Sequence, residues 1–488
     1  MSVPVESFVL DPAHGGTLQR QLQDLVIAGV LSGRMRPGAR MPSSRALARH
    51  LGVSRVTVTL AYADLVSGGW LDARGRSGTF VGHDAPRPIR PTRRPAPAPS
   101  GAVDWARALA PRLAEPRSVA RPGDWRRYRY PFLYGQVGAE LFDHANWRRC
   151  ALRALGAGDF AAMTEDSYGR DDPLLVDEIV RRILPRRGIA ARPEEVLVTM
   201  GAQNALWLVA QVLLGQRRTA AMEEPGYPAL RDILTQARGA AVSVPVDEDG
   251  LPPDAVPEGT DVVFVTPGHH CPTGVAMPAA RRRALLALAE RRDMLIVEDD
   301  YEFELGRAEP PLPALKAMDR AERVVHVGSF AKSLFPGLRL GYVVAAAPLI
   351  EALRRMRGLV LRHPPGHAQR ATAYFLADGH YDAQVARMSR ALRARRQAAL
   401  DAMEAHGLAP ATAGGRGGSW IWMRAPGGQT AAALAARLRR RDVLIEPADA
   451  FFEGGAPGPF YRLGYGLVTA RDMPEGIGRI AEAGRRLA

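Results

Sequence analysis

The first eighty residues carry apolar side chains at the spacing of short helices. Residues 17–31 are predicted as an amphipathic helix, because one face collects the apolar side chains Leu18, Leu22, Leu25 and Val26. Pro37-Gly38 then breaks the pattern, and residues 45–51 and 55–67 are predicted as two further helices. The second of these has apolar side chains available for packing at Val56, Leu60, Ala63 and Leu65.

Caps and a hairpin complete this region. Ser43-Ser44 and Ser54 precede the two later helices, where a serine oxygen can cap the free amides of the first turn. Residues 70–81 are predicted as a strand, a glycine-containing turn and a second strand. The pattern therefore indicates a helix, a helix-turn-helix and a β-wing, which together form a domain of residues 1–82.

A proline-rich stretch separates this region from the rest of the chain. Residues 86–99 contain six prolines and four arginines. This composition disfavours helix and sheet and is typical of an extended, semi-rigid tether. We assign residues 83–125 to this linker. Its arginines are expected to be solvated, and the alternative is that they add non-specific affinity for DNA.

Strands and helices alternate through residues 126–488, which predicts an α/β fold around a mainly parallel sheet. Apolar strands are expected at 196–199, 261–267, 294–297 and 323–329. From about residue 380 to 488, a long helix is followed by strands at 419–423, 443–445 and 460–465. This part is predicted as a smaller C-terminal α+β subdomain.

Composition narrows the function classes. The chain has no run of some 18 apolar residues, so we expect no membrane span. The N-terminus lacks a basic segment followed by an apolar one, so we expect no signal peptide. Cys150 and Cys271 are the only cysteines and stand in no metal-ligand spacing. A reducing cytoplasm is the simplest setting.

Positive charge gathers near the N-terminus. The net charge is +14, and residues 1–100 hold 13 arginines against 6 acidic residues, a net +7. A nucleic-acid contact is therefore expected in this part of the chain. Arg45 and Arg55 open the two helices of the predicted turn, and Arg74 and Arg76 stand at the wing tip. The alternative is a small helical packing module with an adventitious basic face.

Residues 17–81 resemble the winged helix of the GntR family. The resemblance lies in Met41-Pro42-Ser43-Ser44-Arg45, in Ser54-Arg55-Val56-Thr57-Val58 and in Ser77-Gly78-Thr79-Phe80-Val81. It implies binding to double-stranded operator DNA, with contacts from Arg45, Arg55, Thr57 and Gly78. Whether the two arginines read guanine or grip phosphate stays open at this point.

One lysine stands out in an arginine-rich chain. Of 65 basic residues only Lys316 and Lys332 are lysines. Arginine cannot form a Schiff base, so a retained lysine is a candidate for chemistry. Lys332 lies on a loop at a strand end, where α/β sheets bind ligands, between Ser329 and Arg339, whose side chains suit a phosphate. These features suggest pyridoxal 5'-phosphate held as an internal aldimine, whereas Lys316 lies in an ordinary connector.

The same segment resembles the lysine loop of fold-type I aminotransferases, with the pattern Ser-x-x-Lys-Ser-x-x-Pro-Gly-x-Arg-x-Gly. The resemblance implies that the turn after strand 196–199 cradles the phosphate through Gly201, Ala202 and Gln203, ahead of a helix at 204–214. It also implies that Tyr227 stacks on the cofactor ring, although an ordinary loop tyrosine is an alternative.

Acidic and polar residues after the next strands fit the same family. By resemblance, Asp299 pairs with the pyridinium nitrogen and Tyr301 bonds the ring oxygen, with Asp300 as the competing carboxylate. The usual Asn-Pro-Thr-Gly reads Cys271-Pro272-Thr273-Gly274 here, and a thiol replaces an amide poorly. His269 or His270 could take over this role. Two adjacent histidines with no further ligand pattern predict no metal site.

A single arginine lies inside an apolar strand near the C-terminus. Arg462 is expected to need an anion, because a buried unpaired guanidinium is costly. In aminotransferases an arginine here binds the substrate carboxylate, so the resemblance makes Arg462 the candidate contact for an effector. A salt bridge to a neighbouring acid is the alternative.

Winged helix, linker and aminotransferase-like domain, in this order, resemble the MocR-type subfamily of GntR transcriptional regulators. The resemblance implies a homodimer, often head-to-tail in this family, that uses pyridoxal phosphate to sense a small amino compound or the cofactor itself. An effector would act through its differential affinity for two arrangements of the dimer. The main alternative is a working aminotransferase with an added DNA-binding module. A protein that has lost the cofactor is disfavoured by Lys332, Asp299 and Arg339.

Overall fold

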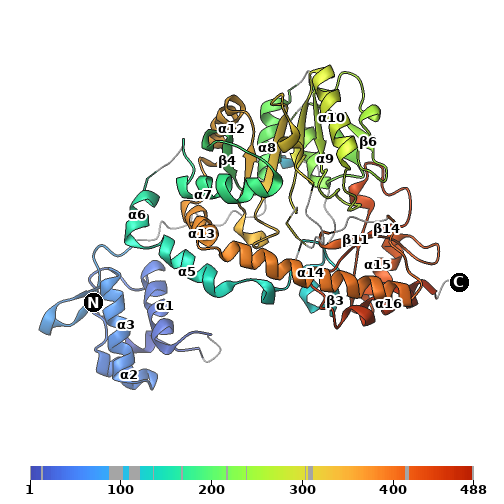
Figure 1. Ribbon diagram of the computed structural model, residues 1–488. Helices are drawn as coiled ribbons and strands as arrows, with labels where there is room; N and C mark the ends of the chain where they lie inside the picture. The colour runs from blue at the N-terminus through green and yellow to red at the C-terminus, as the bar shows by residue number, and fades with distance from the viewer. Residues whose placement is uncertain are drawn as a thin grey trace. The chain divides into compact units, whose positions relative to one another are not determined.

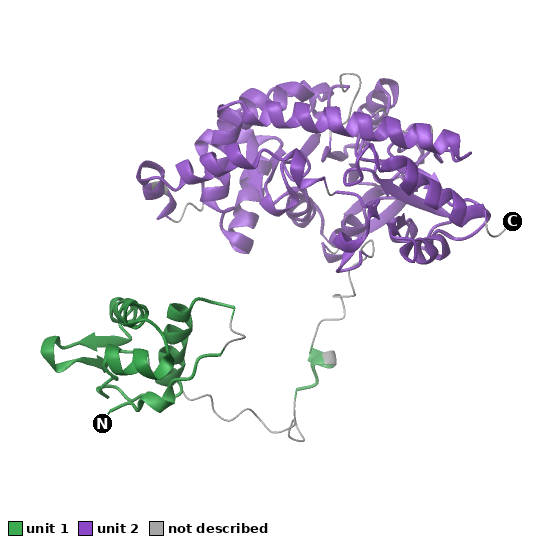
Figure 2. Ribbon diagram, turned by 90° about the horizontal axis from the view of Figure 1, so that it is seen from below, with its two compact units in different colours: residues 1–109 green, residues 110–488 purple. Residues whose placement is uncertain are grey.

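The chain forms two compact units, residues 1–109 and 110–488 (Figure 2). The computed structural model describes residues 2–11, 15–86, 103–108, 121–135, 137–165, 169–215, 218–237, 239–302, 304–305, 312–412 and 417–485. Most of the predicted linker, residues 83–125, lies outside these ranges. Each unit is treated by itself below.

The first unit contains the predicted helix-turn-helix and wing. Its elements are α1 (Leu18–Leu31), α2 (Ser44–Leu51), α3 (Arg55–Ser67), β1 (Leu71–Ala73) and β2 (Thr79–Val81). Ser43 and Ser54 cap α2 and α3, since their hydroxyls accept hydrogen bonds from the amides of Ala46 and Thr57 at 3.2 and 3.1 Å. β1 and β2 pair antiparallel. A short helix, α4 (Trp105–Ala108), follows at the end of the unit.

The packing face of α3 differs from the predicted one. The core of this unit uses Val58, Ala61, Tyr62 and Leu65. Val56 is 65% exposed and Leu60 49% exposed, and Ala63 is exposed as well. Leu18 of α1 was also expected in the core but is half exposed. Apolar residues cover nearly the whole circumference of α3, so their spacing alone did not identify the buried side.

A seven-stranded sheet organises the second unit (Figure 1). Its order is β4-β10-β9-β8-β7-β5-β6, and only β10 runs antiparallel to its neighbours. The strands are β4 (Val196–Thr199), β5 (Thr219–Glu224), β6 (Ala240–Pro245), β7 (Val262–Val265), β8 (Leu295–Asp299), β9 (Val324–Ser329) and β10 (Gly341–Val344). The predicted, mainly parallel sheet is confirmed.

Helices cover this sheet on both faces, which is why its central strands are apolar throughout. Alternate residues of β8 show this: Val297 packs with α8, α9 and α12, whereas Ile296 packs with α10. The helices of this region are α5 (His144–Ala154), α6 (Ala157–Met163), α7 (Pro173–Glu178), α8 (Ala202–Leu213), α9 (Pro228–Gln236), α10 (Ala279–Arg292), α11 (Leu315–Met318), α12 (Ala347–Leu361) and α13 (Gly366–Ala377).

The C-terminal subdomain has its own core. Its elements are α14 (His380–Ala405), β11 (Trp420–Arg424), α15 (Ala431–Arg439), β12 (Val443–Leu444), β13 (Glu446–Pro447), β14 (Phe460–Gly464) and α16 (Met473–Arg485), with β11, β14 and β13 in one sheet. An earlier strand, β3 (Tyr130–Pro131), pairs with β12. The start of the second unit therefore belongs to this subdomain, although the sequence placed it with the large sheet. Among the described residues, no helix is both long and apolar enough to cross a membrane.

Candidate functional site

Lys332 lies on the loop between β9 and β10. Its Nζ stands 4.1 Å from the centre of the Tyr134 ring. Gly135 has a φ of +75°, which favours glycine, and a Cβ atom there would lie 2.6 Å from Nζ, so the backbone approaches the amine closely. Burial lowers the pKa of Lys332 from 10.5 to about 8. The amine is therefore much closer to its neutral, nucleophilic form at physiological pH than an exposed lysine is.

The residues that are expected to bind the phosphate lie at the same edge of the sheet. Strand pairing places Gly341 beside both Ser329 and Thr199, so the ends of β9 and β4 lie on either side of the start of β10. Gly201 has a φ of +81° and precedes α8, which begins at Ala202, two residues earlier than predicted. Ala202 and Gln203 thus belong to its first turn, whose free amides favour an anion.

Arg339 precedes β10, the strand that pairs with β4, and its side chain reaches the start of α8. A Cβ atom on Gly201 would lie 3.4 Å from Nη2 of Arg339, and Nη2 donates a hydrogen bond to the Met200 carbonyl at 3.3 Å. Arg339 is exposed and has a left-handed φ of +53°. A cationic fork therefore stands beside the amides of α8, which is an arrangement suited to a phosphate.

Asp299 and Asp300 have different partners. Asp300 Oδ2 accepts a hydrogen bond from Nε of Arg187 at 2.5 Å, and both side chains are buried. Oδ1 of Asp299 is also buried but has no hydrogen-bond partner among the described residues. Burial and the nearby Asp300 raise the pKa of Asp299 to about 7. Asp299 is thus the carboxylate of the two that is available to a cationic ligand atom.

Tyr227 and Tyr301 each donate a hydrogen bond to another candidate residue of the site. The Tyr227 hydroxyl donates to Oε1 of Gln203 at 3.3 Å, which joins the ring candidate to the phosphate cradle. The Tyr301 hydroxyl donates to the His269 carbonyl at 2.9 Å. Both tyrosines border the apolar cluster that contains Cys271. Cys271, which replaces the usual asparagine, therefore lies among the candidate cofactor contacts.

The adjacent histidines point to different partners. His269 stacks on the Trp420 ring with 4.0 Å between ring centres, and its Nδ1 lies 3.7 Å from Oε2 of Glu302. His270 bonds the Thr273 hydroxyl through Nδ1 at 2.7 Å, and burial lowers its pKa to about 3. His270 is therefore a neutral structural residue. Of the two histidines, His269 is the one that stacks on Trp420 of the C-terminal subdomain.

Arg462 has a carboxylate partner. Its Nε donates to Oε2 of Glu446 at 2.9 Å, and both side chains are buried. The guanidinium also stands 4.1 Å from the centre of the Tyr134 ring. Tyr134 therefore contacts both Lys332 and Arg462. The salt bridge that the sequence left as the alternative is present, and it lies next to the lysine.

A cavity of about 370 Å³ opens beside Lys332. Its wall is largely apolar, with Phe142 and Phe335 among the side chains that line it. Two buried polar atoms on its wall, Oε2 of Glu302 and Oγ of Ser419, have no hydrogen-bond partner among the described residues. A space of this size with few polar groups is typical of small-molecule sites.

The candidate DNA contacts lie on the first unit. Arg45 and Arg55 are exposed at the starts of α2 and α3, and Nε of Arg55 lies 3.4 Å from the Ser44 hydroxyl. Thr57 is only partly exposed, and its hydroxyl shares a hydrogen bond of 2.8 Å with the capping Ser54 hydroxyl. The exposed neighbours on α3 are instead Val56, Thr59 and Leu60. Val56 and Leu60 were not predicted as surface residues, because their apolar side chains were expected to pack in the core.

The wing presents its two arginines differently. Arg74 lies over the Phe80 ring at 4.7 Å and 3.8 Å from Asp72. Arg76 is exposed at the tip. Gly78 has a φ of +105° and a ψ of −165°, a conformation that other residues rarely adopt. Its role in the structure is thus to shape the wing, and its backbone is close to Arg40.

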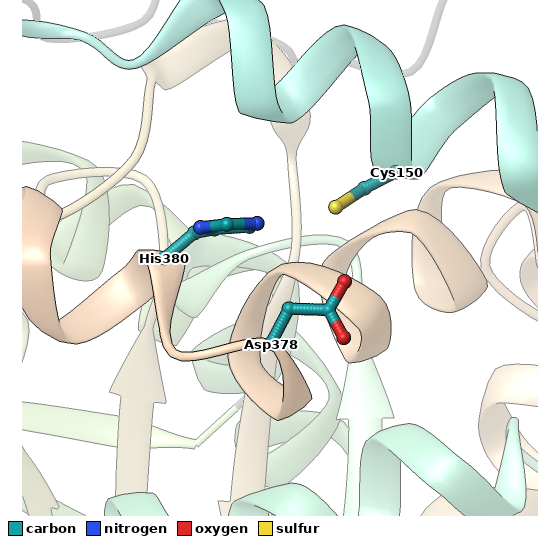
Figure 3. A group of neighbouring side chains, drawn as sticks. All are labelled: Cys150, Asp378 and His380. Carbon is teal, nitrogen blue, oxygen red and sulfur yellow. The ribbon is translucent and has the colours of Figure 1, made fainter.

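Cys150, Asp378 and His380 converge, with ligand atoms within 4.8 Å of one another (Figure 3). Arginines already approach two of the three side chains. Arg149 Nη2 lies 3.3 Å from His380 Nε2, and Arg153 Nη1 lies 3.6 Å from Asp378 Oδ1. Burial also raises the pKa of the Cys150 thiol, which opposes thiolate formation. These charges disfavour a bound cation.

The residues around Lys332 fit pyridoxal phosphate. The amine has a lowered pKa, Arg339 and the start of α8 offer phosphate contacts, and the unpartnered Asp299 oxygen suits a pyridinium N–H. These three features stand at the carboxyl ends of β9, β4 and β8. Glu446 and Tyr134, which no motif identified, complete the surroundings of Arg462.

Comparison with known proteins identifies both units. Bacterial regulatory proteins of the gntR family match residues 18–81, and aminotransferase class I and II matches residues 151–480. The HTH-type transcriptional regulator TauR of Rhodobacter capsulatus is 56% identical over 99% of this chain and 100% of that protein. The probable rhizopine catabolism regulatory protein MocR of Rhizobium meliloti is 30% identical over 97% of this chain and 95% of that protein.

A solved structure extends the comparison to the cofactor. The α-aminoadipate aminotransferase LysN of Thermus thermophilus, in complex with N-(5'-phosphopyridoxyl)-L-leucine, matches with a TM-score of 0.69 and 27% identity. The match covers 79% of this chain and 99% of that one. The chain therefore belongs to the MocR-type GntR transcriptional regulators, in which a DNA-binding winged helix is joined to an aminotransferase-like domain that binds pyridoxal 5'-phosphate.

Proposed function

We propose that the second unit is a sensor for a small amino compound that carries an anionic group, and that it controls DNA binding by the first. The observation that carries the proposal is the contact of one ring, Tyr134, with both Lys332 and Arg462, 4.1 Å from each cationic group. An amine-reactive centre and an anion-binding group thus lie within the span of one small molecule.

The residues have distinct roles in this proposal. Pyridoxal phosphate supplies an aldehyde that condenses with primary amines. Lys332 holds it covalently. Ser329, Arg339 and the turn Gly201, Ala202 and Gln203 bind its phosphate. Asp299 keeps the ring nitrogen protonated, while Tyr227 and Tyr301 contact the ring. Arg462 binds the anionic group of the effector, and the cavity of about 370 Å³ beside Lys332 leaves room for further atoms near the amine.

In this proposal, the surface that contacts DNA consists of Arg45, Arg55, Thr57, Arg74, Arg76 and Gly78. In the same proposal the chain acts as a head-to-tail homodimer in the cytoplasm, where its operator DNA is accessible. Two winged helices held by one dimer predict two half-sites separated by whole helical turns. Effector and operator affinity are then linked, with a coupling of about 1–3 kcal/mol.

The test uses purified full-length protein loaded with pyridoxal phosphate. Borohydride reduction should abolish the visible cofactor band and leave the adduct on the peptide containing Lys332. Lys332→Ala should remove the adduct, and Lys316→Ala is the matched control. Operator affinity, measured with and without cofactor and amines, should change in the wild type and stay constant in Lys332→Ala. An adduct on Lys316, or an operator affinity that never changes, would contradict the proposal.

Transaminase activity is the competing reading. The curated relatives reported above are regulators, and the thiol of Cys271 stands at the position of the usual asparagine. Its pKa is raised to about 12 by burial, so it offers a weak neutral donor there. Sustained formation of keto acid from an amino donor, at many turnovers per site, would favour the enzyme.

A further inference from the structure

Glu446 is shared by two arginines. Its Oε2 accepts the hydrogen bond from Nε of Arg462 at 2.9 Å, and its Oε1 lies 3.4 Å from Nη2 of Arg121. The carboxylate is buried, with 1% of its side chain exposed. A buried charge of this kind holds its partners in place, because losing one leaves it uncompensated.

Arg121 comes from the segment that the sequence assigned to the linker. Nη2 of Arg121 also donates to the Tyr134 carbonyl at 2.9 Å. Its side chain is 31% exposed. Arg121 thus fastens the beginning of the described part of the second unit, residues 121–135, to the interior of the subdomain.

Tyr134 closes this network on its other side. Its backbone amide donates to Oε2 of Glu446 at 3.2 Å, and its ring contacts Lys332 and Arg462. Three contacts therefore meet at Glu446: one from the proposed effector site, one from Tyr134 and one from the end of the linker segment.

The charges in this network do not balance. Two guanidinium groups, Arg121 and Arg462, share the single carboxylate of Glu446. The trio has one positive charge in excess. An anion that binds at Arg462 would balance it, and Glu446 would then be attracted less strongly to Arg462 and relatively more strongly to Arg121.

We propose that Arg121 and Glu446 are positioning residues of the effector site, through which binding of an anionic group at Arg462 tightens the attachment of the linker segment. The inference rests on the proposed function and adds its route of regulation. An effector that reaches Arg462 strengthens the Glu446–Arg121 contact. By reciprocity, loss of Arg121 lets Glu446 pair fully with Arg462 and weakens binding of the effector's anionic group.

The experiment compares Arg121→Gln, Arg121→Lys and the wild type as full-length, cofactor-loaded proteins. Arg129→Gln is the matched control, because Arg129 lies on the same segment but pairs with the exposed Glu475 at 3.2 Å. The probes are glycine, β-alanine and 4-aminobutanoate, each paired with the amine that lacks its carboxylate. Changes in the visible cofactor band give the affinities, and hydrogen exchange of residues 121–135 reports the attachment.

The wild type should bind at least one amino acid more tightly than its matched amine. Arg121→Gln should reduce that preference about fivefold or more, in line with typical coupling between sites. Affinity for the matched amine should not change, Arg121→Lys should restore part of the preference, and Arg129→Gln should behave as the wild type. Bound amino acid should slow exchange of residues 121–135 in the wild type and in Arg129→Gln, but not in Arg121→Gln.

Two results would overturn the inference. One is an Arg121→Gln protein with the wild-type preference and exchange. The other is a wild type that never distinguishes the amino acids from their matched amines. Failure of the proposed function gives a separate result, because the wild type would then lack the Lys332 adduct or operator binding before any probe is added.

Discussion

Arg187 donates a hydrogen bond to Asp300 across 2.5 Å in the interior of the second unit. The preceding carboxylate, Asp299, points to other surroundings and has an oxygen without a partner among the described residues. Successive side chains of an extended segment face opposite sides, so one carboxylate serves the interior and the other the site. Of these two adjacent aspartates, Asp300 therefore has a structural role and Asp299 has the proposed role toward the cofactor.

Asp300→Asn should destabilise the protein, because it removes the carboxylate from a buried ion pair with Arg187. Breaking a buried ion pair on one side costs about 3–5 kcal/mol. Asp299→Asn should leave thermal stability of the cofactor-free protein unchanged or higher and alter the cofactor's absorption spectrum. Thermal unfolding and absorbance of both variants check this. Equal loss of stability in the two would show that the assignment of roles is wrong.

Cofactor loading should depend on pH through Lys332. Burial lowers the pKa of this amine from 10.5 to about 8, so the neutral form predominates above about pH 8. The rate of attachment to the cofactor-free protein should rise with pH and level off above that value, because only the neutral amine attacks an aldehyde. Stopped-flow absorbance measures the rate. A rate that still rises steeply near pH 10, the ordinary range of lysine, would contradict the lowered pKa.

Glu223 should make the cofactor-free protein less stable as pH rises. Burial raises the pKa of this carboxyl from 4.5 to about 8, although Thr266 donates to it from its backbone amide at 2.9 Å. Between these two pKa values the folded state holds a proton that the unfolded state has lost, so the free energy of unfolding falls with rising pH. Glu223→Gln should flatten this slope in chemical denaturation. Identical slopes of unfolding free energy against pH in the wild type and Glu223→Gln would show that another group causes the pH dependence.

Arg55→Ala should weaken operator binding by about 1–3 kcal/mol if the side chain reads a base. If it contacts a phosphate instead, the log–log salt dependence should become shallower by about 0.9. Arg20→Ala is the control, since Arg20 pairs with Asp24 on α1 at 3.3 Å. Fluorescence anisotropy at several salt concentrations distinguishes the outcomes. Undiminished affinity and slope would remove Arg55 from the contact surface.

Val56 and Leu65 should respond differently to truncation, since both lie on α3 but only Leu65 is buried. Leu65→Ala should cost about 2–5 kcal/mol of folding stability. Val56→Ala should change stability by less than about 0.5 kcal/mol and instead weaken binding to operators with thymine at the contacted step, whose methyl group suits an apolar side chain. Denaturation and binding to base-substituted duplexes measure the two effects.

The sequence by itself determined the order of domains and the chemistry of the lysine. Pro37-Gly38 and the serine caps are local signals, and they act through backbone conformations that need no distant partner. Lys332 was identified by its rarity and by the strand ends and phosphate-binding residue types around it. These features depend on residues that are close together in the sequence, so they could be predicted without the tertiary structure.

The tertiary structure decided which similar residues face which partner. Asp300 is engaged because Arg187, 113 residues earlier, reaches it, and Arg462 is paired because strand β13 carries Glu446 beside it. Val56 is exposed although its helix is apolar on most sides. In each case the choice depends on the free energy of burying one side chain against a segment remote in sequence, which residue type and spacing do not encode.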